Sequence, residues 1–416
     1  MHAEIISIGD ELLIGQTINT NAAWMGEQLN LIGIDVIRTI VISDKKEAIL
    51  DTLYESSQRV NIILITGGLG PAKDDITKHT LCEYFNSNLV RDEETLKLIE
   101  DYFTKRGRQM LETNRQQADL PDNCKVLKNI HGTAPGMWFE KNDCLYVSMP
   151  GVPYEMKAIM SEYVIPELKN RFINETILHR TILTQGIGES FLAEIIKAWE
   201  IKLRNEQLSL AYLPSPGIVR LRISAKGKNE QELQQKINFF EKELIQLIPQ
   251  YVYGFEKEKL EEITGKLLFN KKQTLSIAES CTGGYISHLI TSVSGSSNYF
   301  LGSVISYDNS VKINQLGVYN EDINKHGAVS QQIVEQMAIG VRKLINTDYS
   351  IAVSGIAGPD GGTPDKPVGT VWIAIAHPNG VYSKKFLFEQ NRERNIQRTA
   401  LTALNLLRKI ILGENI

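Results

Sequence analysis

The sequence predicts an α/β protein, in which two three-layer α/β domains are joined by a small α+β domain. Two patterns predict this class: apolar runs of strand length alternate with amphipathic stretches in the first and last parts of the chain, and a hairpin pattern separates these parts. The length of 416 residues agrees, because domains of roughly 100 to 200 residues imply two to three of them. We expect the domains at residues 1–168, 172–254 and 258–412.

The first domain has a βαβ pattern, which is typical of a parallel sheet covered by helices. Nearly unbroken apolar runs predict strands at residues 3–9, 35–42, 61–68 and 145–148. Apolar residues at helical spacing predict helices at residues 21–33, 45–60 and 155–172.

The middle domain changes character, and the last domain returns to alternating strands and helices. In the middle domain we expect a strand, a helix, a hairpin and a second helix, at residues 180–188, 191–203, 208–227 and 229–249. In the last domain we expect strands at residues 274–278, 303–307, 349–355 and 369–378. Its helices are expected at residues 257–273, 283–293, 330–345 and 396–412.

Charge and composition argue against several classes of protein. A formal net charge of −4 supplies no basic excess for neutralising phosphates, so nucleic acid is not an expected partner. No run of about 18 apolar residues is present, so no membrane span is expected. The first residues lack the features of a signal peptide, and the four cysteines form no CxxC pair. We therefore expect a cytoplasmic protein.

A glycine-rich loop follows the third apolar run, in the segment TGGLGPAKDDIT at residues 66–77. Glycines at the carboxyl end of a parallel strand allow backbone N–H groups to approach an anion. Asp74 and Asp75 follow at once and offer oxygen ligands to a hard cation. The alternative is an ordinary turn in which Asp75 caps the next helix.

A second loop, AESCTGG at residues 278–284, runs from a predicted strand into a predicted helix. Free backbone donors at the start of that helix are expected to bind a phosphate or a carboxylate group. Cys281 is either a thiolate nucleophile or a small packing residue. Packing is the expected role, because His288, the candidate base, lies about two helical turns further along.

A third loop, SGIAGPDGGTPDKPVGT at residues 354–370, is longer than most loops in compact domains. Its glycines, among them Gly358, allow the backbone to wrap a ligand or an oxyanion, with Asp360 between them. The alternative is a long surface loop.

Ser297 and Lys312 lie between these two loops, in the stretch GSSNYFLGSVISYDNSVK at residues 295–312. A serine and a neutral lysine can hydrolyse an amide when burial or a nearby cation lowers the lysine pKa. On its own the stretch is also compatible with an ordinary loop, strand and helix start. The chain contains no GxSxG, HExxH, GxGxxG or P-loop signature, so the usual hydrolase and nucleotide motifs are absent.

Four loops of the first domain match, in order, those of a known domain: GDELLIG with NTNAAW, TGGLG, HGTAPGMWF and MPGVPYEM. Residues 1–168 thereby resemble the MoaB-type, molybdopterin-binding-like domain of the CinA family. The resemblance implies metal-dependent ADP-ribose pyrophosphatase activity, with a divalent metal ion at Asp74 and Asp75. Its implied ligand site consists of Asp10, Asn21, Gly67, Gly68, Gly70 and Asp74. The family usually has threonine where this chain has Ala72.

Residues 258–412 resemble the C-terminal, PncC-type domain of the same family, through AESCTGG, GSSNYFLGSVISYDNSVK, HGAVS, SGIAGPDGG and KPVGTVW. That family hydrolyses nicotinamide mononucleotide to nicotinate mononucleotide and ammonia, and needs no cofactor for this reaction. The resemblance implies Ser297 as the nucleophile, Lys312 as the base and Arg392 as the family's arginine. A cation such as Arg392 is one way to lower the lysine pKa, and it is also suited to the nucleotide phosphate. Arg394 is the alternative to Arg392.

The same resemblance implies a set of substrate contacts in the last domain. Tyr307 is expected to stack on the pyridine ring. The other implied contacts are Thr282, Gly283, Gly284, Gly358 and Asp360. Two positions differ from the common family pattern, which has serine at Asp308 and aspartate at Asn391.

The middle domain resembles the KH-type linker of full-length CinA proteins. The resemblance implies a homodimer that acts on nicotinamide mononucleotide and ADP-ribose in pyridine nucleotide salvage. The alternative is a regulatory protein that binds nucleotides or pterins without turnover and is linked to competence or DNA damage. A role in molybdenum cofactor assembly rests on fold-level analogy for the first domain alone.

Overall fold

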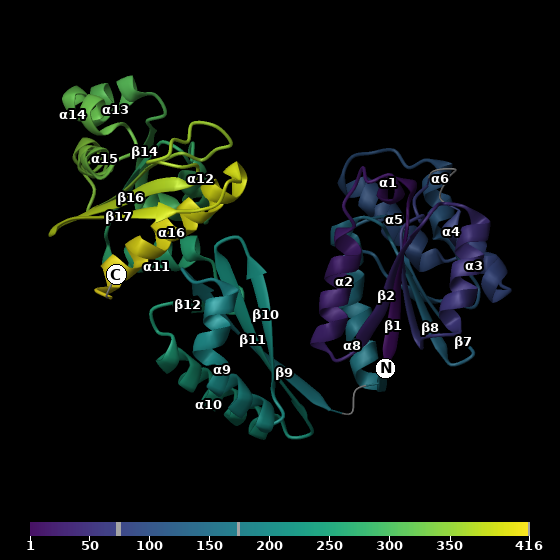
Figure 1. Ribbon diagram of the computed structural model, residues 1–416. Coiled ribbons are helices and arrows are strands. Elements are labelled where there is room, and N and C mark those ends of the chain that lie inside the picture. The colour runs from purple at the N-terminus through teal and green to yellow at the C-terminus, as the bar shows by residue number, and fades with distance from the viewer. Residues whose placement is uncertain (72–75, 173–174, 415–416) are drawn as a thin grey trace. The chain divides into compact units, whose positions relative to one another are not determined.

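The computed structural model describes residues 1–71, 76–172 and 175–414. Contacts divide the chain into two compact units, residues 1–177 with 227–229 and residues 178–226 with 230–416 (Figure 1). The predictions for Ala72, Asp74 and Asp75 fall outside the described residues. No helix within the described ranges is long and apolar enough to cross a membrane.

The first unit is built on a six-stranded sheet with the order β2-β1-β3-β8-β7-β6. Its strands are β1 (His2–Ile8), β2 (Asp35–Ile42), β3 (Ile62–Thr66), β4 (Leu89–Arg91), β5 (Asp119–Pro121), β6 (Lys125–Leu127), β7 (Gly136–Lys141) and β8 (Cys144–Met149). Its helices are α1 (Asp10–Leu13), α2 (Thr20–Leu31), α3 (Lys46–Ser57), α4 (Thr77–Phe85), α5 (Glu93–Lys105), α6 (Glu112–Arg115), α7 (Pro153–Ile159) and α8 (Ile165–Phe172). A separate two-stranded sheet pairs β4 with β5.

The sheet of the first unit is mixed, which corrects the prediction of a parallel sheet. Strands β2, β1, β3 and β8 are parallel, as predicted. Strand β7 instead pairs antiparallel with both β8 and β6. The connection from β7 to β8 consists of Asn142 and Asp143 alone, and a two-residue connection permits only antiparallel pairing.

Helices cover both faces of this sheet and form two apolar cores. On one face, α2, α7 and α8 pack against Ile5 and Leu64. A π-helical turn at Met160–Val164 joins α7 to α8. On the other face, α3 and α4 pack against Ile6 and Ile63. Because strand side chains alternate between the faces, one strand contributes to both cores. This is the three-layer arrangement predicted from the alternating pattern.

The second unit begins with a four-stranded sheet in the order β10-β11-β9-β12. Its elements are β9 (Thr176–Gln185), α9 (Glu189–Asn205), β10 (Ser209–Ser215), β11 (Ile218–Gly227), α10 (Glu230–Leu247) and β12 (Val252–Phe255). The predicted strand, helix, hairpin and helix are all present, and β12 adds an unpredicted strand beside β9. This part is therefore α+β, as expected.

The rest of the second unit is a five-stranded sheet in the order β14-β13-β15-β16-β17. Its strands are β13 (Leu275–Glu279), β14 (Phe300–Ile305), β15 (Tyr349–Gly355), β16 (Thr370–His377) and β17 (Gly380–Leu387). Its helices are α11 (Leu260–Lys271), α12 (Tyr285–Thr291), α13 (Asn309–Leu316), α14 (Asn320–His326), α15 (Gln331–Ile345) and α16 (Arg392–Leu412). Strands β14, β13 and β15 are parallel, whereas β16 and β17 are antiparallel to their neighbours.

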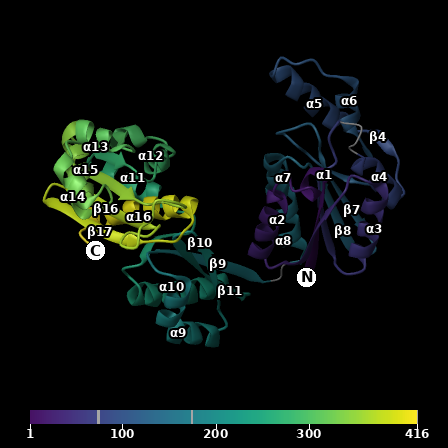
Figure 2. The same cartoon turned by 45° about the horizontal axis from the view of Figure 1, so that its top comes forward.

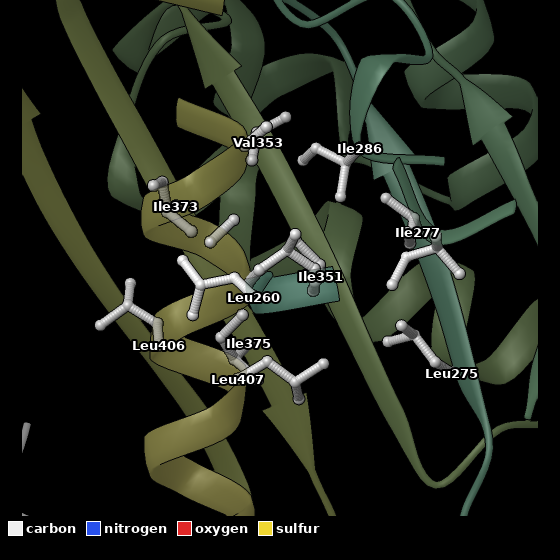
Figure 3. Packing of buried hydrophobic residues seen from close by; sticks show 14 of the residues in the cluster. Leu260, Leu275, Ile277, Ile286, Ile351, Val353, Ile373, Ile375, Leu406 and Leu407 are labelled. Carbon is white, nitrogen blue, oxygen red and sulfur yellow. The ribbon is translucent and has the colours of Figure 1, made fainter. Parts of the chain in front are cut away.

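Helices again cover both faces of the five-stranded sheet (Figures 1 and 2). On one face, side chains of α11, α12 and α16 meet the strands, as Leu260, Ile286 and Leu407 do around Ile351 and Ile373 (Figure 3). On the other face, α13 and α15 pack on small strand residues. The fold class predicted from the sequence is confirmed for both α/β parts.

Candidate functional site

The candidate site of the second unit lies where three parallel strands end. In the register of the sheet, Glu279 at the end of β13 pairs with Ile305 of β14 and with Val353 of β15. The next residues, Ser280 and Ser306, therefore lie beside each other at the same edge of the sheet. Carboxyl ends of parallel strands are where open α/β sheets bind their ligands.

Lys312 is buried at this edge, with 2% of its surface exposed. It comes from α13, and its Nζ donates hydrogen bonds to the backbone oxygens of Ser306 at 2.7 Å and Tyr307 at 3.1 Å. Burial lowers the Lys312 pKa from its ordinary value of 10.5, although the nearby Asp308 and Cys281 raise it. Of the two causes that the sequence left open, burial or a nearby cation, burial is the one that lowers the Lys312 pKa here.

Arg392 brings two other predicted site residues together. Its Nη2 donates to the hydroxyl of Tyr307 at 3.0 Å, and its Nη1 donates to the backbone oxygen of Gly358 at 2.8 Å. Arg394 points elsewhere, because it forms an ion pair with Glu389 at 3.4 Å. Of the two alternatives, Arg392 is thus the arginine that lies beside Tyr307.

The two positions that depart from the family pattern both cap helices. The side chain of Asp308 accepts a hydrogen bond from the backbone N–H of Ser310 at the start of α13. The side chain of Asn391 accepts one from the backbone N–H of Arg394 at the start of α16. Aspartate and asparagine are strong N-cap residues, so these departures keep the helices that carry Lys312 and Arg392 in place.

The glycine loop after β15 supplies backbone groups to the site. Gly358 has a φ of +90°, and a Cβ there would lie 2.5 Å from the Val368 side chain, so glycine is required. No hydrogen bond within the described part of the chain uses the backbone N–H groups of Gly358 or Asp360. These donors are therefore available to a ligand. The Asp360 side chain is exposed.

The loop before α12 does not offer the free anion site that the sequence predicted. The Glu279 carboxylate, which is fully buried, occupies the start of this helix. It accepts hydrogen bonds of 2.6 to 3.1 Å from Thr282 Oγ1, from the N–H groups of Gly284, Ile286 and Ser287, and from Ser287 Oγ. Gly283 donates its N–H to the Ser280 oxygen. The Thr282 hydroxyl and the N–H groups of Gly283 and Gly284 thus have partners within the chain, so the free donors expected at this helix start are not found. The substrate contacts implied for these three residues stay a prediction.

Cys281 has the packing role that the sequence favoured. It belongs to the core cluster on the α12 side of the sheet and is 7% exposed. Burial raises the pKa of its thiol to about 12, so a reactive thiolate is disfavoured.

Ser297 is not brought together with Lys312. Ser297 lies in the 3-10 turn Ser296–Asn298 before β14, whereas Lys312 lies on α13 after that strand. Phe300, the first residue of β14, pairs with Leu275 at the start of β13. The ends of a six-residue strand are roughly 17 Å apart at about 3.3 Å per residue. Within one chain, Ser297 and Lys312 therefore lie at opposite ends of β14.

Ser280 is a serine at this strand edge that the sequence analysis did not consider as a nucleophile. It directly follows β13 and neighbours Ser306, whose backbone oxygen holds Lys312. Its side chain is 9% exposed, and its hydroxyl forms no hydrogen bond with the residues that the structure describes. Strand direction could have identified Ser280. It follows a parallel strand, so it lies at the carboxyl end of the sheet together with the glycine loop after β15. Ser297 precedes a parallel strand and therefore lies at the other end.

Four of the predicted ligand residues of the first unit line a cavity of about 380 Å³. The lining includes Asn21, Gly67, Gly68 and Gly70, and Asp10 adjoins it through a hydrogen bond from its N–H to Asp44 at 3.1 Å. Asn21 Nδ2 donates to Thr66 and Gly151, while its Oδ1 is buried without a partner among the described residues. An unpaired buried acceptor of this kind is suited to a ligand donor.

Carboxylates suited to a divalent cation also line this cavity. They belong to Glu11 and Asp44. No group of three or more histidine, cysteine, aspartate or glutamate residues suited to a metal occurs in the described ranges. Magnesium is commonly held by one or two carboxylates together with substrate phosphates, so these two residues fit such an ion. The predicted ligands Asp74 and Asp75 lie outside the described residues.

Three family models match the chain. The "CinA C-terminal domain" matches residues 257–411, the "Probable molybdopterin binding domain" residues 4–170, and the "Damage-inducible protein CinA KH domain" residues 179–254. The chain is 48% identical to a CinA-like protein of Cytophaga hutchinsonii, over 98% of each chain. It is 50% identical to one of Flavobacterium psychrophilum, over 99% of each chain. It is 42% identical to one of Trichormus variabilis, over 99% of this chain and 100% of the relative.

Proposed function

Because the chain belongs to the CinA family, we propose that its last domain hydrolyses nicotinamide mononucleotide to nicotinate mononucleotide and ammonia. One observation carries this proposal: a buried lysine with a lowered pKa lies at the strand edge that also presents a serine, an arginine and free backbone donors. A serine with a neutral lysine is a known arrangement for amide hydrolysis.

In the proposed reaction, Ser280 Oγ attacks the carboxamide carbon while Lys312 Nζ accepts the hydroxyl proton. Both N–H groups of a neutral Lys312 amine are directed at the two backbone oxygens, which leaves its lone pair for this proton. The C–N bond then breaks, and Lys312 returns the proton to the departing ammonia. Water hydrolyses the resulting ester by the same route and regenerates the serine.

The other groups at this edge have positioning roles in the proposal. The N–H groups of Gly358 and Asp360 donate to the oxyanion that forms in the tetrahedral intermediate. Arg392 faces the phosphate of the substrate, and the exposed ring of Tyr307 stacks on the pyridine ring. The proposal thus replaces Ser297 by Ser280 and keeps Lys312 and Arg392.

Ammonia release from nicotinamide mononucleotide by the purified chain tests the function, and a pair of arginine variants tests the site. Arg392→Ala is expected to lower kcat/KM about 10- to 100-fold, because it removes the contacts with Tyr307 and Gly358. Arg394→Ala loses only an exposed ion pair, so its kcat/KM is expected to stay within about threefold of that of the unaltered chain. No ammonia from the unaltered chain would overturn the proposed function, and equal losses in the two variants would overturn the site.

The pH dependence of this activity follows from Lys312. Only the neutral amine can accept the serine proton, so the rate is expected to rise with pH through the lowered pKa and to level off below pH 10.5. Lys312→Arg, which stays protonated, should lose the activity and with it this rising limb. Lys325→Arg, at an exposed position on α14, is the matched control. A pH-independent rate between pH 6 and 10 would contradict the role of Lys312 as base.

A regulatory protein without turnover is the alternative function. It would bind nicotinamide mononucleotide at the same edge and release no ammonia. Saturable binding measured by calorimetry, with no product after prolonged incubation, would favour this alternative over the hydrolase.

For the first domain we propose cleavage of a phosphoanhydride such as ADP-ribose. The polar cavity with the unpaired Asn21 oxygen supports it, since that oxygen can accept a hydrogen bond from a ribose hydroxyl. A bound divalent cation would neutralise charge on the phosphates, with Glu11 and Asp44 as its holders. We expect ADP-ribose cleavage that requires added Mg²⁺ or Mn²⁺ and falls at least tenfold in Asp44→Asn. Cleavage with neither ion present, or no loss in the variant, would contradict this assignment.

A further inference from the structure

A larger cavity, of about 580 Å³, lies within the second unit, where the KH-type part meets the five-stranded α/β part. One wall is formed by residues 185–189, which run from the end of β9 to the start of α9, together with the β10–β11 turn. The opposite wall is formed by β17 and by the middle and end of α16. Its volume is within the range of small-molecule sites. None of the residues assigned above to the amidohydrolase edge lines it.

The charged groups that line this cavity are mostly cationic. Three cationic residues, Lys384, Arg398 and Lys409, line it together with one acidic residue, Glu189. In the described part of the chain neither Lys384 nor Lys409 forms an ion pair. Arg398 pairs with Glu389 through Nη2 at 2.9 Å, while its Nε is buried without a partner among the described residues. The cavity therefore holds uncompensated positive charge, which favours an anionic ligand.

The two lysines are close enough to affect each other. Burial lowers the Lys409 pKa, and the charges of Arg408 and Lys384 lower it further, with Glu414 acting in the opposite direction. A phosphate between the two ammonium groups would remove this repulsion and would be held from both sides.

Apolar rings and buried amides complete the lining. Phe386 and Phe388 lie side by side, with ring centroids 5.8 Å apart and planes inclined by 14°. Gln185 donates to Thr402 Oγ1 at 3.0 Å and accepts from Asn405 Nδ2 at 2.6 Å, and all three of these side chains are more than nine-tenths buried. Hydrogen bonds between buried side chains thus hold the polar wall in place, while the rings offer an apolar surface to a base.

The start of α9 adds backbone donors to the same wall. Its N-cap is Gly188, which has no side chain to accept a hydrogen bond from the first turn of this 17-residue helix. The N–H groups of such a turn carry a partial positive charge and suit a phosphate.

We propose that this cavity binds a mononucleotide, with the phosphate between Lys384, Lys409 and the start of α9, and the base against the Phe386–Phe388 surface. This ligand site is additional to the proposed amidohydrolase site and does not depend on that activity. Three features of the cavity indicate this ligand class. Its positive charge favours a phosphate, its aromatic rings favour a planar group, and its volume accommodates both.

Calorimetric titration of the full chain with AMP, adenosine and inorganic phosphate tests the proposal. AMP is expected to bind at least tenfold more tightly than either partial ligand. Lys384→Gln and Lys409→Gln should each weaken AMP about tenfold, whereas Lys343→Gln, at an exposed position of α15, should stay within twofold. Arg392→Ala controls for AMP bound at the other site and should leave this binding unchanged.

Hydrogen exchange locates the bound ligand. AMP is expected to slow amide exchange in peptides that cover residues 185–189 and 384–388. Unchanged exchange in both segments, equal affinities for AMP and phosphate, or AMP binding that survives in the Lys384→Gln/Lys409→Gln double variant would each overturn the proposal.

Discussion

Replacement of Ser280 by alanine is expected to lower kcat for nicotinamide mononucleotide hydrolysis at least a thousandfold, whereas Ser297→Ala should stay within about threefold. The reason is geometric, because Ser280 lies beside the strand end that holds Lys312 and Ser297 lies at the opposite edge of the sheet. Loss of a nucleophile removes the covalent route entirely, and only weaker effects of binding and oxyanion stabilisation remain. The measurement is single-turnover release of ammonia by each purified variant.

Two further measurements make this comparison decisive. Thermal unfolding of Ser280→Ala should match the unaltered chain, since the hydroxyl forms no hydrogen bond with the described residues. Ser280→Cys should retain partial activity, because a thiol can take the place of the hydroxyl. The reverse ranking, with Ser297→Ala inactive and Ser280→Ala active, would exclude Ser280 as the nucleophile.

The largest expected effect on stability concerns Glu279. Glu279→Ala removes an acceptor of five hydrogen bonds from a fully buried position and leaves their donors unsatisfied. The free energy of unfolding is expected to fall by about 3 to 5 kcal/mol, because a buried donor left without a partner costs about 1 to 3 kcal/mol and several are left here. Urea unfolding, followed by the circular dichroism signal of the helices, measures it.

The matched control for this substitution is an exposed glutamate in another helix start. Glu321→Ala, in the first turn of α14, is expected to change the free energy of unfolding by about 0.5 kcal/mol or less. Glu279→Gln should fall between the two, since its single amide oxygen can still accept some of the bonds. Equal stability of Glu279→Ala and Glu321→Ala would show that the donors find water or other partners.

Much of the fold could be predicted because its strands are buried apolar runs. β15, for example, is almost wholly buried and occupies residues 349–355 as expected, and the hairpin of β10 and β11 follows its alternating pattern. β17 was missed because it is an edge strand with polar residues such as Lys384 and Lys385, so it lacks an apolar run. The antiparallel edge of the first sheet was missed because strand direction depends on short connections that periodicity does not report.

The loops of the site could be predicted from the sequence, but the contacts between them could not, because these depend on strand direction and on the pairing of strands in the sheet. Arg392, Tyr307 and Gly358 are far apart in sequence, and the loops around them were recognised one by one, but their contacts required the folded sheet. The distinction between Arg392 and Arg394 depends on the helical phase set by the Asn391 cap. Burial of Lys312 was likewise not visible, since its helix is mostly polar.

The buried Glu279 has a consequence for how firmly the Ser280 backbone is held. Glu279 directly precedes Ser280, and its carboxylate accepts hydrogen bonds from the N–H groups of Gly284, Ile286 and Ser287. The end of β13 and the start of α12 are therefore tied together across the short loop that carries Ser280. A single side chain thus fixes the position of this hydroxyl without contacting it.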